Sequence, residues 1–399
     1  MIPSSGENMI NIIDKSQCCG CTACASACPI DAIEMRPDGM GFLYPFVDES
    51  KCVNCGKCEK VCSFNDHYDI RLNLPRPDVY GARHKDIHEV ETSRSGAAFI
   101  AISDYILKHG GVVYGVGYKD HFCVVHKRAT TKEERNEFKG SKYVQSDLRG
   151  IFRQVRHDLL DGMTVLFTGT PCQTSGLIAY IGKKLRQNLF LVDIPCYGVP
   201  GPYLWRDFLS YIEKKQGDKV CWVNFRDKQR FGWNAPPHET FKFVNGGGGK
   251  DKVIAFKYVF YHYIMFRRSC GVCHFANTKR PSDITIGDFW GWQNTNPKFN
   301  EDNKGVSLVL VNTEKGREMF DAIKDELYYF TDVLENALQP VLCKPTSIHP
   351  HRDAFEEDYL KHGFEHAMKK FGRLGWKYYY YIFKNQIKNM IMGKKMTEI

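Results

Sequence analysis

Hydrophobic and polar positions alternate in two different ways along the chain. In the first part, short apolar stretches separate cysteine-rich segments, and we expect a short helix in residues 29–35 and a strand in residues 41–51. In the longer second part, apolar runs typical of buried strands alternate with runs typical of helices. A polar, proline-containing stretch at residues 67–77 lies between the two parts and is predicted to be a linker.

The second part predicts an α/β domain. Its strands are almost continuously apolar, so we expect helices on both faces of the sheet. Ligands of such domains bind at the carboxyl ends of the strands, which places candidate site residues in the loops after them. The strands are expected at residues 79–84, 112–118, 123–130, 164–169 and 188–194, the helices at 96–111, 148–162 and 174–185, and a hairpin turn at 245–250.

Composition narrows the classes of protein that fit. The chain has 399 residues, an ordinary apolar content of 43% and a formal net charge of +9. The positive charge is spread along the sequence, which does not favour nucleic-acid binding. There is neither a long apolar run for a transmembrane span nor a pattern typical of a signal peptide, so we expect a cytoplasmic protein. Sixteen cysteines in such a protein indicate metal binding rather than disulfides.

Two cysteine runs near the N-terminus share the spacing C-x2-C-x2-C-x3-C. This spacing is typical of bacterial ferredoxins, in which the fourth cysteine of each run binds the other cluster. A pair of zinc sites would need no such exchange, and we favour two 4Fe–4S clusters. The expected ligand sets are Cys18, Cys21, Cys24 and Cys62 for one cluster, and Cys52, Cys55, Cys58 and Cys28 for the other.

A further C-x2-C pair, Cys270 and Cys273, lacks a second pair nearby. Cys172 and Cys196 each follow a predicted strand, so both belong at the edge of the sheet where ligands bind. All four together would form a third 4Fe–4S site. The alternative is that Cys172 and Cys196 are small buried residues, and the spacing alone does not decide between the two. We expect structural roles for the remaining cysteines, which are Cys19, Cys123, Cys221 and Cys343.

Five motifs resemble one family. They are "GSKYVQS", "VLFTGTPCQTSGL", "DIPCYGVPGP", "NFRDKQRFGW" and "RRSCGVCHFANTKRPSDITIGDFWG". Together they are similar to the beta subunit family of coenzyme F-420 hydrogenase/dehydrogenase, from about Val79 to Thr313, and to bacterial members fused to a ferredoxin. The resemblance implies FAD and a third 4Fe–4S cluster in this domain. Two residues depart from the family pattern: Ala97 stands where the family has a second glycine, and Tyr197 where it often has histidine.

The resemblance also implies cofactor contacts. Ser95 and Gly96 open a predicted helix, whose free amides suit a diphosphate. The sequence alone favours an ordinary helix cap, and the resemblance favours the two residues as FAD contacts. Lys142 is expected near a phosphate or the flavin ring, or else on the surface. Asp288 is expected to bind a ribose or to orient the cluster loop. The charged group at residues 226–228 suggests a salt-bridged strand end, which we favour, or a clamp for an acidic substrate or cofactor.

The expected architecture is an α+β ferredoxin-like module with two 4Fe–4S clusters, followed by an α/β flavin-binding domain. The last segment is basic and aromatic from Arg373 on, and it is expected to form a helix that packs on the domain or touches a membrane surface. The expected divisions are residues 1–66 for the ferredoxin domain, 67–77 for the linker, 78–345 for the FAD and 4Fe–4S domain in two parts (78–160 and 161–345), and 346–399 for the tail.

Together, these expectations predict an iron–sulfur flavoprotein oxidoreductase. It would pass electrons between ferredoxin-type clusters and a flavin that acts on a small organic substrate or on a coenzyme. The alternative is a non-catalytic electron-transfer subunit that links a partner enzyme to a ferredoxin pool. Either version needs an electron donor such as ferredoxin or a redox partner subunit. The sequence names neither the substrate nor the catalytic residues.

Overall fold

We describe a computed structural model of the chain, which covers residues 8–64, 68, 70–235, 239–250 and 255–376, with 379, 380, 383, 384 and 387 beyond them. The N-terminal domain carries one antiparallel strand pair and two short helices beside its cysteine loops. Its elements are η1 (Lys15–Gln17), α1 (Ala23–Ala27), β1 (Ile33–Pro37), β2 (Leu43–Val47) and α2 (Lys57–Lys60).

The helix expected at residues 29–35 is wrong, because β1 begins within it. Ile33 and Met35 are buried while Glu34 and Arg36 are exposed. This alternation has the period of a strand with one covered face. The strand expected at residues 41–51 is confirmed as β2, which pairs with β1 from Ile33 opposite Val47 onward.

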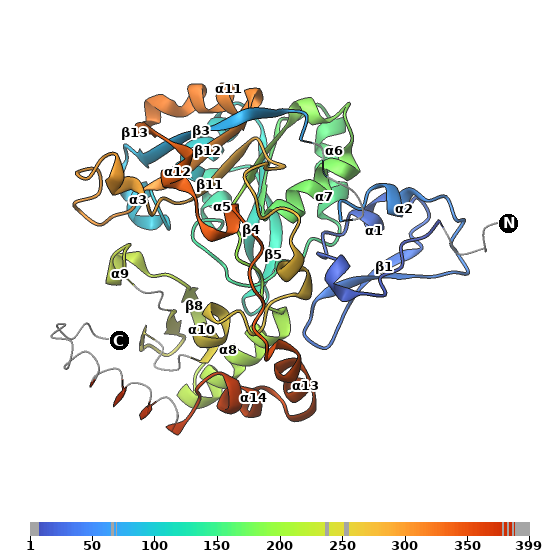
Figure 1. Cartoon of the computed structure of the whole chain (residues 1–399), viewed down its shortest axis with the longest axis vertical. Helices are drawn as coiled ribbons and strands as arrows, with labels where there is room; N and C mark the ends of the chain where they lie inside the picture. Colours follow the sequence, from blue (N-terminus) through green and yellow to red (C-terminus); the bar gives the residue numbers. More distant parts are fainter. Residues whose placement is uncertain are drawn as a thin grey trace.

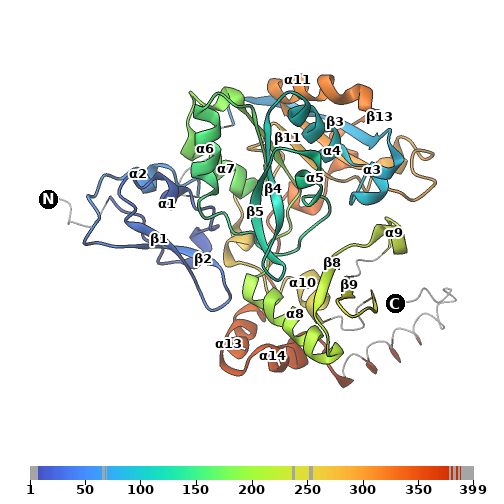
Figure 2. The same cartoon turned by 180° about the vertical axis from the view of Figure 1, so that it is seen from behind.

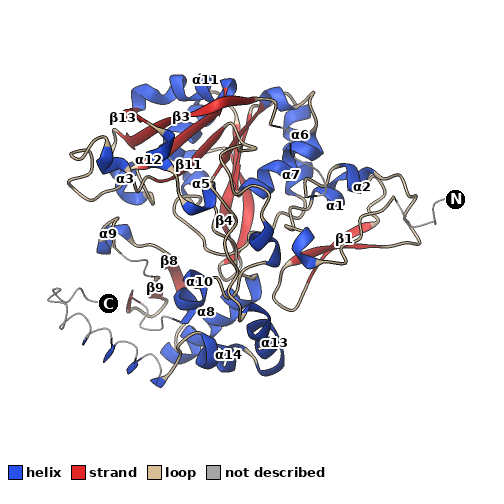
Figure 3. Cartoon of the chain, in the orientation of Figure 1, coloured by secondary structure: helices blue, strands red, loops and turns tan. Residues whose placement is uncertain are grey.

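A mixed sheet of eight strands forms the centre of the larger domain (Figure 3). Four neighbouring strands, β11, β7, β6 and β4, run parallel to one another, and the remaining pairings are antiparallel. The strand order is β13-β3-β12-β11-β7-β6-β4-β5. The strands are β3 (Asn73–His84), β4 (Val112–Lys119), β5 (Cys123–Ala129), β6 (Val165–Gly169), β7 (Leu189–Asp193), β11 (Ile284–Asp288), β12 (Ser307–Thr313) and β13 (Leu327–Asp332).

Helices cover both faces of the sheet, as the apolar strands predict. On one face, α4 and α11 pack against alternate strand residues such as Val113 and Leu166. On the other face, α6 and α7 pack against their neighbours Val112 and Val165. The helices of this domain are α3 (Ile87–Thr92), α4 (Ala98–Lys108), α5 (Lys132–Asn136), α6 (Ile151–Leu160), α7 (Pro171–Ile181), α11 (Glu314–Ile323) and α12 (Leu334–Ala337).

Two boundaries differ from the sequence expectation, and one expected turn is confirmed. β3 begins at Asn73, inside the segment predicted as a linker. α7 begins at Pro171, where Thr170 and Gln173 form a capping box, so Cys172 lies in the first turn of a helix and not in a loop. The hairpin expected at residues 245–250 is confirmed by the pairing of β9 with β10.

A second lobe packs below the sheet around its own aromatic core (Figures 1 and 2). Trp205, Phe208 and Phe256 are fully buried there and contact one another. The expected tail contributes α13 and α14 to this core, while much of the chain after Arg373 lies outside the described residues. The elements are α8 (Pro202–Gln216), β8 (Val220–Asn224), α9 (Lys228–Phe231), β9 (Thr240–Phe243), β10 (Gly248–Lys250), α10 (Ala255–Tyr261), α13 (Arg352–His362) and α14 (Phe364–Phe371).

The N-terminal domain docks on the face of the sheet that carries α6 and α7 (Figures 1 and 2). Ala23 of α1 is buried in the core formed by these helices. Arg153 of α6 donates hydrogen bonds to the carbonyls of Ala25, Ser26 and Cys28. Gly176 of α7 lies so close to the Cys21 side chain that an added Cβ would be 2.7 Å from the sulfur. This glycine therefore permits direct contact between the helix and a cysteine loop. Within the described part of the chain, no helix has the length and apolar content of a membrane span.

Candidate functional site

Two small cavities in the N-terminal domain bring together the cysteines of the predicted ligand sets. One cavity is lined by the first three cysteines of the first run and the last cysteine of the second. The other cavity shows the reciprocal exchange. The candidate ligands are Cys18, Cys21, Cys24 and Cys62 in the first cavity, which Cys19 also lines, and Cys28, Cys52, Cys55 and Cys58 in the second. The thiol set therefore fits two four-ligand clusters of the ferredoxin kind.

The structure also gathers the four cysteines proposed for a third cluster. Cys172 comes from α7, Cys196 from the loop after β7, and Cys270 and Cys273 from η3 (Arg268–Val272) and its C-cap. Each of the four thiols interacts electrostatically with the other three. Burial raises the pKa of Cys270 to about 12 and that of Cys273 to about 11. A buried group of four thiols suits a cation that stabilises their thiolate forms.

Cys19 lies between the first ferredoxin site and this four-cysteine site. Hydrogen bonds to Cys172 and Cys21 raise the pKa of the buried Cys19 thiol well above its ordinary value. The same hydrogen bonds favour the thiolate forms of both neighbours, and the pKa of Cys172 is lowered to about 7. Cys19 is thus a proton donor to two candidate ligands, which the sequence did not indicate. Phe64 and Phe275 pack around it and keep the junction apolar.

Arg267 is the buried cation at this junction. Its guanidinium donates to the carbonyls of Cys18 and Leu43, at 2.7 and 2.8 Å, and to the side-chain oxygen of Gln145, at 3.0 Å. It also lies 3.6 Å from the sulfur of Cys18. The amide of Gln145 in turn donates to the carbonyl of Cys19. Arg267 therefore connects the second domain to the first cysteine loop.

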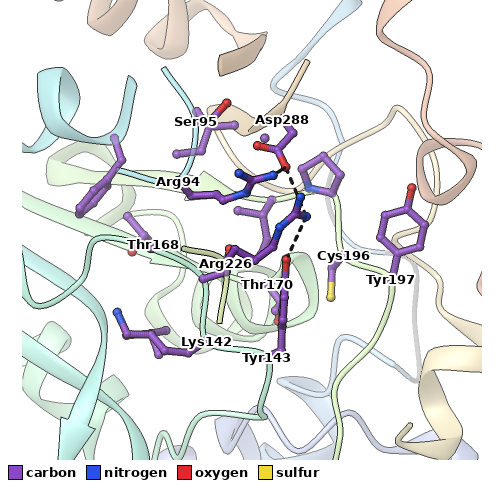
Figure 4. A pocket seen from close by; sticks show the side chains of 18 of the residues that line it. Arg94, Ser95, Lys142, Tyr143, Thr168, Thr170, Cys196, Tyr197, Arg226 and Asp288 are labelled. Carbon is purple, nitrogen blue, oxygen red and sulfur yellow. Dashed lines mark hydrogen bonds and ion pairs between the residues drawn. The ribbon is translucent and has the colours of Figure 1, made fainter. Parts of the chain in front are cut away.

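A cavity of about 760 Å³ opens at the carboxyl ends of β6, β7 and β11, where the sequence predicts a ligand site (Figure 4). Thr168 and Gly169 line it from β6, Ile286 and Asp288 from β11, and Cys196 from the loop after β7. Aromatic side chains line much of the rest, among them Phe99, Phe138, Tyr143, Tyr197, Phe260, Tyr261 and Trp290. The volume and lining are those of a small-molecule or cofactor site. Cys196 belongs both to this cavity and to the four-cysteine site.

Ser95 and Gly96 have different environments from those expected. Ser95 lines the cavity, but its hydroxyl donates to the carbonyl of Val306 at 2.6 Å. Gly96 is absent from the lining, and a Cβ there would lie 2.2 Å from the carbonyl oxygen of Ala82. The close approach requires a glycine here for packing against the sheet, and the expected cofactor contact of Gly96 stays a prediction. Ala97, which lines the cavity, has a φ of 66°, a conformation that favours the glycine of the family pattern.

Lys142 and Asp288 both line the cavity. The ammonium group of Lys142 donates to the carbonyls of Glu137 and Lys139, and burial lowers its pKa to about 7. Lys142 is therefore not a surface residue, and its charge is directed into the protein. Asp288 accepts hydrogen bonds from Trp233 and Arg94, at 3.0 and 3.2 Å.

Sequence reasoning missed Arg94 and favoured a structural role for Arg226. Both guanidinium groups lie in the cavity beside Asp288 (Figure 4). Arg94 is adjacent to Ser95 in the sequence, but nothing in its local pattern distinguishes it from a surface arginine. Of the other charged residues in the same motif as Arg226, Asp227 caps α9, and Lys228 is buried with its ammonium donating to three backbone carbonyls.

His126 anchors a polar network beneath the cavity. Its ring nitrogens contact the carbonyl of Thr168 and the hydroxyl of Ser146, and Gln173 donates to the same hydroxyl. Burial lowers the pKa of His126 from 6.5 to about 4. The neutral imidazole therefore fits the folded state, while the protonated form is favoured after unfolding.

We expect acid to destabilise the protein through this histidine. Between pH 6.5 and about 4 the unfolded state binds a proton that the folded state does not, so the free energy of unfolding falls as the pH falls. The full effect is about 3 kcal/mol below both pKa values. His126→Gln should flatten this part of the profile in urea unfolding. Parallel profiles for the wild type and His126→Gln would contradict the assignment.

Comparisons with known proteins agree with this two-part description. Residues 162–336 match the model for the C terminus of the coenzyme F420 hydrogenase/dehydrogenase beta subunit, and residues 17–65 match a 4Fe-4S dicluster domain. No curated protein matched the chain. A solved structure described as a xenon derivatization of the F420-reducing [NiFe] hydrogenase complex from Methanosarcina barkeri is similar at 16% identity and a TM-score of 0.45, over 76% of this chain and 94% of that one. The chain thus joins a ferredoxin-type 4Fe-4S dicluster domain at residues 17–65 to a region, residues 162–336, that matches the C terminus of the coenzyme F420 hydrogenase/dehydrogenase beta subunit family.

Proposed function

We propose that this protein is an iron–sulfur flavoprotein oxidoreductase that passes electrons between three 4Fe–4S clusters and an FAD bound in the large cavity. One observation carries the proposal: the four-cysteine site lies between the first ferredoxin site and that cavity. On one side, Cys172 contacts Cys19, which also contacts Cys21. On the other side, Cys196 lines the cavity. The candidate centres therefore form a continuous series.

The large cavity fits a flavin in size and character. Its volume of about 760 Å³ lies in the range of cofactor sites, and its walls are mostly apolar and aromatic. When bound, FAD supplies the conversion between two-electron chemistry on a substrate and single-electron transfer with a cluster. Thr170 and Gln173 at the start of α7, and Ser141 and Tyr143 in the loop of residues 140–143, add polar side chains to the lining, which suit a cofactor's polar groups.

The protein's own residues exclude water and position polar groups. Phe64 and Phe275 surround Cys19 and Cys172 and keep the path between the two domains apolar. In the cavity, burial raises the pKa of Tyr197 and of Tyr261, so both phenols stay protonated at neutral pH. The hydroxyl of Tyr261 already hydrogen-bonds to Tyr143, while that of Tyr197 is available as a donor to a substrate or flavin oxygen.

The alternative function is an electron-transfer subunit without a substrate of its own. It is supported by the match to a subunit family, because such subunits work beside partner chains. Saturable turnover of an added small molecule by the isolated chain favours the enzyme. Reduction of a dye by the isolated chain, with no small molecule turned over and electrons accepted only from a partner protein, favours the subunit.

FAD binding tests the flavoprotein proposal directly. We expect anaerobically prepared protein to release about one FAD per chain on denaturation, as binding at a single site requires. Ile194 lines the cavity with 42% of its surface exposed, so Ile194→Trp should fill the cavity without disturbing the core. This variant should lose FAD and keep its iron. Val333→Trp, at a site 56% exposed and outside the cavity, is the matched control.

Two results would contradict the proposal. Wild-type protein that holds its iron but never binds FAD would be an iron–sulfur relay. Ile194→Trp protein with full FAD would place the flavin outside this cavity.

A further inference from the structure

Two buried guanidinium groups share a single carboxylate in the large cavity. Arg94 lies 3.2 Å and Arg226 3.8 Å from the same oxygen of Asp288. Each arginine side chain is 12% exposed. Asp288 is the one carboxylate among the described residues that line the cavity. The group thus carries a net positive charge in a place where charge is costly unless it is paired.

The hydrogen-bonding capacity of both arginines is incompletely used. Arg94 donates through one terminal nitrogen to Asp288 and to the carbonyl of Trp233, while its buried Nε has no partner among the described residues. Arg226 makes one long side-chain hydrogen bond, of 3.4 Å, to the hydroxyl of Tyr143. Arginine has five N–H donors in a planar fork, so each side chain retains donors for a ligand.

Neighbouring residues hold this pair in place. Trp233 donates to Asp288 at 3.0 Å and stacks on Trp290 with 4.6 Å between ring centroids. Lys228 ties the start of α9 to the carbonyls of Val90, Ser95 and Lys304, which fixes the turn that carries Arg226. The arginines are therefore positioned before any ligand binds, which lowers the entropic cost of binding.

We propose that Arg94 and Arg226 form an anion-binding subsite for a phosphate or carboxylate group of a molecule in the large cavity. The guanidinium fork matches both groups in bidentate geometry. Asp288 pairs with both guanidinium groups, so it competes with the incoming anion for them. The anion is either the diphosphate of FAD or an acidic group of the small-molecule substrate. This inference rests on the proposed function only in taking the large cavity as a ligand site.

Titrations with inorganic pyrophosphate, FAD and riboflavin test the subsite. Calorimetry on protein freed of flavin compares the wild type with Arg94→Gln and Arg226→Gln. Each substitution should weaken pyrophosphate binding about tenfold or more, as expected for lost hydrogen bonds between charged groups. Asp288→Asn should strengthen it, because the competing charge is removed. Arg206→Gln, on the exposed face of α8, is the matched control and should change nothing.

The two sources of the anion give different results. If the diphosphate of FAD binds here, the wild type prefers FAD to riboflavin, and Arg226→Gln removes that preference. If a substrate group binds here, FAD affinity is unchanged, and pyrophosphate shifts the flavin absorbance of FAD-loaded wild type but not of Arg226→Gln.

The inference is overturned if both arginine variants bind pyrophosphate and FAD as the wild type does, or if Asp288→Asn weakens pyrophosphate binding. Failure of the proposed function looks different: the wild type then binds no FAD at all, while the pyrophosphate titration still reports on the arginines. Iron content, measured in the same samples, shows whether each variant has folded.

Discussion

Replacing Cys273 by alanine should lower the iron content of anaerobically prepared protein from about twelve to about eight atoms per chain, because the three proposed 4Fe–4S clusters become two. Cys273 interacts with each of the other three cysteines at the site, so its loss leaves three thiols for a four-ligand cluster. The ferredoxin cavities contain none of these residues and should keep their clusters. Iron and acid-labile sulfide assays measure the change.

The same substitution should interrupt electron flow. The clusters of the N-terminal domain should remain reducible by dithionite, while bound FAD is no longer reduced through them. Cys221→Ala is the control, since Cys221 is exposed on β8 and lies outside all three cysteine groups. About eight iron atoms in the wild type would contradict the third cluster, and full iron in Cys172→Ala or Cys196→Ala would remove that residue from the ligand set.

The sequence was most informative where the chemistry is local. The cysteine spacing of the two N-terminal runs alone predicts which thiols share a cavity, because each set depends on short loops and one exchange. The third set spans more than one hundred residues and could not be settled in that way. It forms because β6 and β7 are neighbours in the sheet, so Cys172 and Cys196 meet beyond the carboxyl ends of these strands. The bridge between Pro200 and Phe266 brings the segment with Cys270 and Cys273 beside the loop after β7. Strand order depends on the whole fold, so it cannot be predicted from any single segment.

The same limit explains which features of the cavity the sequence did not predict. Gly96 fits a cofactor loop by its motif, yet the approach of β3 and β12 requires a glycine there for packing. In the sequence, nothing distinguishes Arg94 from a surface arginine. In the structure, Asp288 at the end of β11 lies beside it. The strand at Ile33 was missed because the alternation is short and a helical start was equally consistent with it. Tertiary contacts decided each case.

We expect the second large effect from a substitution of Arg267, because the positive charge of this residue is buried. The side chain is 1% exposed, and no carboxylate pairs with it within the described part of the chain. Its neighbours are the thiol of Cys18, at 3.6 Å, and the ring of Tyr44, whose centroid is 4.2 Å away. An isolated buried cation is costly, so the negative charge of a cluster bound through Cys18 is its natural partner.

We therefore expect Arg267→Met to have two measurable consequences. Loss of the positive charge should make the cluster bound by Cys18 harder to reduce, because reduction adds negative charge that the guanidinium stabilises. Loss of the hydrogen bonds to Cys18, Leu43 and Gln145 should lower the free energy of unfolding by about 3 kcal/mol or more, as for a broken buried ion pair. Redox titration followed by electron paramagnetic resonance measures the first, and urea unfolding the second.

Two further variants separate charge from geometry. Arg267→Lys keeps the charge but not the planar fork, so it should restore much of the reduction potential and little of the stability. Arg268→Met is the adjacent control: Arg268 is 34% exposed and pairs with Asp353 and Glu356, away from the cysteine loop. If Arg267→Met and Arg268→Met give the same potential as the wild type, Arg267 holds the domains together without acting on the cluster. If Arg267→Lys fails to restore the potential, the hydrogen bond to Cys18 controls it rather than the charge.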